Sequence, residues 1–339
     1  MRKTLSEHPS KKAALNSSRF IPIDLPFQFR VHPGYLEVEE HVRDWAIRSR
    51  LVANERAADG LACTRSGEFC AYTHPDAPMR EVKLAAEVYA WFYVVDDESE
   101  GVRHSGVRYS DEQSWRVFVD GVREVLRHGR TPEAPANTTT AEILASTLDQ
   151  MSMSVSSHWR NRFIEHIVDT LDSAGQELHL KHEGIPPSLE DYVLLRRNTS
   201  AILPSLDLIE FCNGVELSPE TYYSDTYQEI LLTAVDMIAW TNDLYSLNKE
   251  EAGGMVTNLI LVVEHEHKLD RSRAIDEVRA LIDSKVKRFL ELRESLSSKQ
   301  DTHAFELTTQ VSGLCDWIAG CQQWHHNVTH RYLPPPASD

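Results

Sequence analysis

Apolar residues recur along most of the chain at the three- and four-residue spacing of an amphipathic helix, and the alternation typical of strands is nearly absent. This pattern predicts helices that begin near Tyr35 and near Arg80, the second of which runs into Asp96 and Asp97. Further helices are expected over roughly Trp159 to Leu180, Arg271 to Ser297 and Phe305 to Tyr332. The sequence therefore predicts an all-α fold.

Capping signals mark two helix starts. Ser110–Gln113 and Thr139–Glu142 both place a hydroxyl residue three positions before Gln or Glu, which is the pattern of a capping box. They predict helices that run towards His128 and to about Ser156.

Prolines and glycines divide the second half of the chain. After the break at Pro186–Pro187, a helix capped by its first residue is expected over roughly Ser188–Cys212. Another is expected over Pro219–Glu251, because proline suits the first helical position and Gly253–Gly254 stops the helix. No internal repeat and no long linker splits the chain. One domain over residues 21–333 is expected, between a flexible N-terminal tail (1–20) and a C-terminal tail (334–339).

Composition narrows the functional classes. The 339 residues are 41% hydrophobic, which is enough for a large core, and 35 Lys and Arg face 52 Asp and Glu, a formal charge of -17. This balance argues against a general affinity for nucleic acid or anionic membranes. No run of about 18 apolar residues is present, so no membrane insertion is expected. Five scattered cysteines without a CxxC pair indicate reduced thiols in a cytoplasmic protein.

Adjacent acidic residues follow an apolar, aromatic run in FYVVDDESE. On a helix, Asp96 and Glu100 lie one turn apart on one face, with Asp97 alongside. Such carboxylates can gather around a hard cation such as Mg²⁺. A solvated acidic helix end is the alternative, although it opposes the helix dipole. Taken alone, the motif leaves both interpretations open.

A second polar stripe lies in WTNDLYSLNKEE. Asn242, Ser246 and Glu250 follow one another at four-residue intervals and share one helix face. All three offer oxygen ligands suited to Mg²⁺, and Lys249 could bind a phosphate. A polar outer face is the alternative, but it explains less well why Asn and Ser, which are weak helix formers, lie in mid-helix.

Together these motifs resemble those of class I terpene synthases of the microbial, sesquiterpene synthase-like type. Asp96–Glu100 is similar to the family's aspartate-rich motif, and Asn242–Glu250 is similar to its second metal motif. Arg196, 46 residues earlier than Asn242, is placed like the family's diphosphate-sensing arginine. Arg331–Tyr332 resemble its C-terminal pair. The resemblance spans roughly Pro26 to Leu333 and implies a helical bundle around a central active-site cavity.

The resemblance implies a Mg²⁺-dependent enzyme that ionises a linear isoprenyl diphosphate, with farnesyl diphosphate the first expectation. The cation would be cyclised or quenched to a terpene hydrocarbon or alcohol, and diphosphate released. Three Mg²⁺ ions are implied, two held by Asp96 with Glu100, while Asp97 either ligates or orients its neighbours. The third would be held by Asn242, Ser246 and Glu250. The residues implied to bind diphosphate are Arg196, Lys249, Arg331 and Tyr332. The expected catalytic set is Asp96, Arg196, Asn242, Ser246, Glu250, Arg331 and Tyr332.

Aromatic side chains are expected to line the pocket, because ring faces stabilise a carbocation. Tyr89, Phe92 and Tyr93 precede Asp96 on its helix face, although plain core packing explains their spacing equally well. Thr199 and Ser200 stand where the family has a small effector residue, often glycine, at a helix break.

Several alternatives remain beside this interpretation. His325 stands near a position where the family often has an aromatic pocket residue, and a histidine there is unusual. Geranyl or geranylgeranyl diphosphate could replace the C15 substrate. A chain-elongating synthase would need a second aspartate-rich motif, and a protonation-initiated cyclase would need an aspartate in place of Val94. An inactive helical scaffold is the alternative from another class. Antiparallel dimers are common in similar proteins, so a homodimer is an open expectation.

Overall fold

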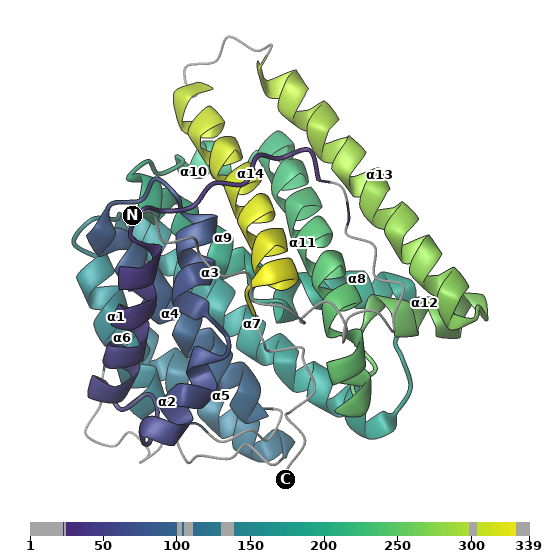
Figure 1. Cartoon of the computed structure of the whole chain (residues 1–339), viewed down its shortest axis with the longest axis horizontal. Coiled ribbons are helices and arrows are strands. Elements are labelled where there is room, and N and C mark those ends of the chain that lie inside the picture. Colours follow the sequence, from purple (N-terminus) through teal and green to yellow (C-terminus); the bar gives the residue numbers. More distant parts are fainter. Residues whose placement is uncertain are drawn as a thin grey trace, which may run out of the picture.

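The computed structural model describes residues 23, 25–99, 104, 111–129, 139–297 and 304–329, and every regular element in these ranges is a helix (Figure 1). The all-α prediction is confirmed. The helices are α1 (Tyr35–Arg48), α2 (Glu55–Ala62), α3 (Ser66–Thr73), α4 (Met79–Ser99), α5 (Glu112–His128), α6 (Thr139–Met151), α7 (Ser157–Glu183), α8 (Leu189–Thr199), α9 (Ile202–Asn213), α10 (Pro219–Tyr222), α11 (Asp225–Ala252), α12 (Leu259–His267), α13 (Arg271–Ser297) and α14 (Ala304–Asn327). The tails predicted at 1–20 and 334–339 lie outside the described residues.

Local side chains set several helix starts. The side chains of Ser156, Ser188 and Ser224 each accept a hydrogen bond from the backbone N–H three residues on. At α5 the capping box is formed by Asp111 and Ser114, whereas the predicted first residue of that box, Ser110, lies outside the described residues. These caps satisfy backbone donors that a helix leaves unpaired at its first turn.

Two long predicted helices are each divided in the structure, which corrects the prediction. The segment expected as Ser188–Cys212 forms α8 and α9, with Ala201 between them in the left-handed region at φ 55. The segment expected as Pro219–Glu251 forms the short α10 and then α11, which starts anew at its own serine cap. Helix α6 ends at Met151 instead of near Ser156. The short helices α2 and α3 were not predicted.

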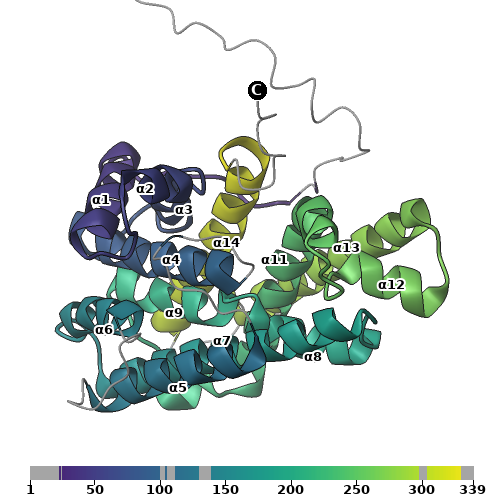
Figure 2. The same ribbon diagram turned by 90° about the horizontal axis from the view of Figure 1, so that it is seen from below.

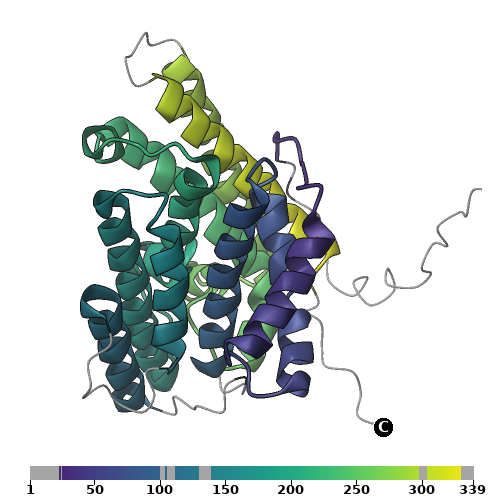
Figure 3. The same ribbon diagram turned by 90° about the vertical axis from the view of Figure 1, so that its left-hand side faces the viewer.

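Helices from both halves of the chain surround a common interior. In Figure 3 most of them run in nearly the same direction, as in a helical bundle. Helix α14 packs against α3, α9 and α11, so the C-terminal part of the chain meets its N-terminal part, while α5 and α8 both pack against α7 (Figure 2). No described helix is long and apolar enough to cross a membrane.

Candidate active site

A cavity of about 210 Å³ lies inside the bundle. Residues of α4, α7, α11 and α14 line it, together with the break between α8 and α9. Aromatic residues form much of the lining, namely Phe69, Tyr89, Phe92, Tyr93, Trp115, Trp317 and Trp324. The structure therefore places all three predicted aromatic residues of α4 at the cavity.

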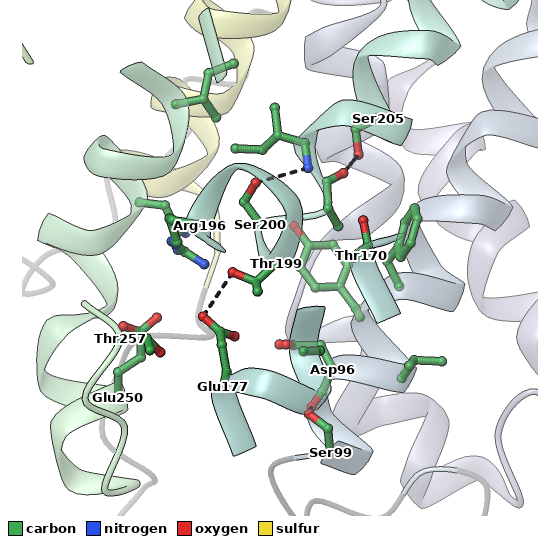
Figure 4. Close-up of a pocket in the computed structure, with 18 of the residues that line it drawn as sticks. Asp96, Ser99, Thr170, Glu177, Arg196, Thr199, Ser200, Ser205, Glu250 and Thr257 are labelled. Carbon is green, nitrogen blue, oxygen red and sulfur yellow. Dashed lines mark hydrogen bonds between the residues drawn. The ribbon is translucent and has the colours of Figure 1, made fainter. Parts of the chain in front are cut away.

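The predicted acidic motif divides at the end of α4. Asp96 lines the cavity, and Figure 4 shows it across from Glu250, with Glu177 between them. Asp97 is buried instead, and one of its carboxylate oxygens lies 2.7 Å from Nε2 of His104. Adjacent helical residues point in different directions, so Asp96 faces the cavity while Asp97 contacts His104. Glu100 lies outside the described residues.

The second motif lies on α11, opposite Asp96. Asn242, Lys249 and Glu250 all line the cavity, and Ser246 is buried between them at 1% exposure. The Ser246 hydroxyl makes no well-formed hydrogen bond within the described residues, yet its proximity lowers the pKa of Glu250. Burial, the largest influence, and the nearby Asp243 carboxylate raise that pKa.

An amide from the next helix orients the Glu250 carboxylate. Nδ2 of Asn258 donates to Oε2 of Glu250 at 2.9 Å and to the backbone oxygen of Asp243 at 2.9 Å. Its Oδ1 accepts the backbone N–H of Ile260 and so caps α12. Because Asn258 is fully buried, both ends of its amide are fixed, and Glu250 is held with it.

Arg196 connects α8 to the same face of α11. Its Nε and Nη2 donate to Oδ1 of Asp243 at 3.0 and 2.7 Å, and Nη2 also donates to Oδ1 of Asn242 at 2.9 Å. Burial alone would lower the pKa of Arg196, but the Asp243 carboxylate and other acidic neighbours raise it, so the guanidinium stays charged. The structure thus holds a charged guanidinium at the cavity, beside the predicted ligand Asn242.

The break between α8 and α9 opens onto the cavity. Thr199, Ser200 and Ala201 line it, and the hydroxyl of Thr199 donates to Oε1 of Glu177 at 2.9 Å (Figure 4). The predicted helix break therefore exists, although neither of its predicted residues is glycine.

Glu177 of α7 belongs to none of the predicted motifs. Burial raises its pKa from 4.5 to about 7, against the opposing influence of Arg196 and of the Thr199 hydroxyl, and the charge of Glu250 adds to the rise. A carboxyl group with a raised pKa binds protons more tightly in the folded state, so its stabilising contribution is complete below about pH 4.5 and is lost as the pH rises through about 7.

Replacement of Glu177 by Gln, which mimics the protonated acid, is expected to stabilise the ligand-free protein at about pH 8 by about 1–3 kcal/mol. The difference should become small near pH 4.5 and vanish below it, where Glu177 is protonated in both the folded and the unfolded protein. Urea unfolding at both pH values measures it. Glu165→Gln, an exposed position on the same helix, serves as the control. An equal loss of stability at both pH values would contradict the assignment.

His325 of α14 contacts the α11 motif directly. Its Nε2 lies 2.9 Å from Nδ2 of Asn242, and its Nδ1 lies 2.9 Å from the backbone oxygen of Cys321. Burial lowers the pKa of His325 to about 3, so the ring is neutral. His325 lines the cavity as predicted, but its polar edge is engaged with Asn242.

The donor chemistry fits divalent cations. Asp96 on one wall, and Asn242 and Glu250 on the other with Ser246 buried between them, can each offer an oxygen ligand, which hard cations such as Mg²⁺ prefer. Cations of the chain lie beside them, namely Arg196, Lys249 and Lys181. The predicted pair Arg331 and Tyr332 lies outside the described residues.

An aromatic cavity with carboxylates on facing helices and fixed cations beside them defines the class I terpenoid synthase type of enzyme. Comparison with known proteins supports the same class of enzyme. A family model described as "Terpene synthase family 2, C-terminal metal binding" matches residues 87–288. The chain belongs to the terpene synthase family: it is a class I enzyme of the microbial type that acts on an isoprenyl diphosphate, and it depends on a divalent metal.

Named relatives cover most of the chain. Germacrene A synthase of Nostoc punctiforme is 27% identical over 91% of this chain and 93% of its own length. The (-)-delta-cadinene synthase of Streptomyces clavuligerus is 30% identical, with 86% and 88% covered. Among solved structures, linalool/nerolidol synthase from Streptomyces clavuligerus superposes with a TM-score of 0.78 at 21% identity, covering 89% of this chain and 99% of that one. This last likeness supports the fold.

Sequence reasoning missed several residues of the site. Glu177, Lys181, His104 and Asn258 contribute a carboxylate, a cation and two partners for predicted ligands. Of these only Asn258 carried a local signal, since asparagine before an apolar run is a helix-cap pattern. The others are brought to the site by packing between helices.

Proposed function

We propose that this terpene synthase ionises farnesyl diphosphate with three Mg²⁺ ions and converts the resulting carbocation into a sesquiterpene. The observation that carries the proposal is the pairing of two oxygen-ligand faces across one aromatic cavity: Asp96 on α4, and Asn242 and Glu250 on α11 with Ser246 buried between them. The named relatives in Nostoc and Streptomyces support the C15 substrate, because germacrene A and delta-cadinene are sesquiterpenes.

Different residues of the chain would bind the metal ions and the diphosphate. When bound, Mg²⁺ would offset the charge that develops on the departing diphosphate. Asp96 would hold two ions together with Glu100, and Asn242, Ser246 and Glu250 the third. Arg196 and Lys249, joined by Arg331 and Tyr332, would bind diphosphate oxygens, and arginine offers a bidentate fork for them. Asp97, paired with His104, would orient the end of α4 without ligating.

The apolar part of the cavity would receive the hydrocarbon. Tyr89, Phe92 and Tyr93 would stabilise the migrating cation through their ring faces and keep water out. Tyr89 is held in place because its hydroxyl accepts from Nε1 of Trp317 at 2.9 Å and lies 2.9 Å from Nε2 of His74. We further propose that residues 21–333 form one domain, that the protein assembles as a homodimer, and that its free cysteines reflect a reducing, cytoplasmic location.

Incubation with farnesyl diphosphate and Mg²⁺ is expected to release a terpene that gas chromatography with mass spectrometry detects. Turnover should cease when EDTA removes the metal and return when Mg²⁺ is restored. Geranyl and geranylgeranyl diphosphate, tested in parallel, should give less product, because the C10 chain would leave part of the cavity empty and the C20 chain would need more room than the C15 chain. A preference for either would replace the C15 assignment, and no product from all three would overturn the proposal.

A further inference from the structure

Two neighbours fix the orientation of the Asn242 amide. A guanidinium can only donate hydrogen bonds, so the Asn242 atom that lies 2.9 Å from Nη2 of Arg196 is the oxygen. The amide nitrogen must then face the other way, towards Nε2 of His325 at 2.9 Å. Opposite ends of the amide are therefore set by residues of two different helices, α8 and α14.

The tautomer of His325 follows from its own partners. Nδ1 lies 2.9 Å from the backbone oxygen of Cys321, which can only accept, so Nδ1 carries the proton. In the neutral ring Nε2 is then an acceptor, which is what the amide NH₂ of Asn242 requires. Both hydrogen bonds are satisfied by one protonation state, and the opposite tautomer would break both.

Packing leaves the His325 ring little freedom to turn. Tyr245 stacks on it with ring centroids 4.8 Å apart and planes 15° apart, and Trp324 approaches its side at 4.9 Å and 70°. The side chain is 7% exposed. A phenyl ring could fill the same space between Tyr245 and Trp324, but it would offer no acceptor to Asn242.

We propose that His325 is a positioning residue that holds the carbonyl oxygen of Asn242 towards the metal-binding face of α11. The inference rests on the proposed function, because it assigns Oδ1 of Asn242 as a metal ligand. Without the acceptor on His325, Arg196 alone would hold the amide, and the NH₂ group, which cannot ligate a cation, could turn towards the metal-binding face. Outer partners of this kind commonly change metal affinity by about 10–100-fold.

The test compares His325→Phe with His325→Gln in the full-length protein. Phe keeps the stacked ring but removes the acceptor, whereas the side-chain oxygen of Gln reaches about as far as Nε2 and can accept from Asn242. Isothermal titration with Mg²⁺ and inorganic diphosphate should show binding weakened about 10–100-fold in His325→Phe and within about threefold of wild type in His325→Gln. With farnesyl diphosphate, the Mg²⁺ concentration for half-maximal rate should rise in the Phe variant and recover in the Gln variant.

The exposed neighbour on the same helix provides the matched control. His326→Phe should bind Mg²⁺ and diphosphate as the wild type does, because His326 points to solvent. If circular dichroism shows that His325→Phe is unfolded, His325→Leu removes the same acceptor with a smaller side chain and takes its place.

The outcomes separate the two proposals. A wild-type protein without Mg²⁺-dependent diphosphate binding would overturn the proposed function and this inference with it. A wild type that binds, next to a folded His325→Phe that binds equally well, would overturn the inference alone. Equal impairment of the Phe and Gln variants would also overturn it, because the role of His325 would then be packing.

Discussion

Replacement of Asn242 by Ala is expected to lower kcat/KM for farnesyl diphosphate by on the order of 10²–10³-fold, with the fold intact. The substitution removes the oxygen that Arg196 and His325 hold towards the cavity, so the face on α11 keeps only Ser246 and Glu250. Little stability should be lost, because Asn242 is only partly buried and Asp243 continues to pair with Arg196. Steady-state kinetics over a range of Mg²⁺ concentrations, with circular dichroism, measure both effects.

Two further variants test whether the loss of activity is specific to the predicted metal ligands. Asp96→Ala removes the oxygen ligand from the facing wall and should give a loss of similar size. Asn213→Ala changes an exposed asparagine at the end of α9 and should leave the rate unchanged. Wild-type rates in both Asn242→Ala and Asp96→Ala would show that the metal ligands lie elsewhere.

The long helices could be predicted because their signal is local. Apolar spacing and serine caps act within a few residues, so α7 and α13 follow from the sequence nearly to their ends. The division between α8 and α9 could not be predicted from apolar spacing, which continues across it; only the family resemblance indicated a helix break at Thr199 and Ser200. Ala201 adopts a left-handed conformation that its side chain disfavours, so the surrounding packing must hold it there. Pro204, in the first turn of α9, was the one local signal of a helix start.

In the candidate site, too, the features set by local spacing could be predicted, whereas those set by packing between helices could not. Asn242, Ser246 and Glu250 share a face because helical geometry places every fourth residue together, and sequence spacing reveals this. The partners that orient them come from other helices, as with Asn258 for Glu250 and His325 for Asn242. Such contacts depend on how helices pack, and no local pattern encodes them. The sequence likewise left open whether Asp97 ligates a metal or orients its neighbours, and the structure places its carboxylate beside His104.

Asp243 lies next to the predicted ligand Asn242, yet its side chain serves the fold. It is fully buried and accepts hydrogen bonds from Arg196, from the hydroxyl of Tyr192 and, at 2.8 Å, from the backbone N–H of Leu259. One carboxylate thereby joins α8, α11 and the start of α12. Loss of this group would leave a buried guanidinium and two further donors without their acceptor.

Replacement of Asp243 by Ala is therefore expected to lower the free energy of unfolding by about 3–5 kcal/mol, the usual cost of removing one partner from a buried ion pair. Urea denaturation measures this loss, and Asp283→Ala, an exposed aspartate on α13, should change stability by less than about 0.5 kcal/mol. Diphosphate and Mg²⁺ should restore part of the stability of Asp243→Ala, because a bound anion gives Arg196 a new partner and any ligand that binds only the folded state stabilises it. A loss below about 1 kcal/mol would mean that Arg196 finds water or another acceptor when Asp243 is gone. The guanidinium would then depend less on α11 for its position than the hydrogen bonds of the folded protein indicate.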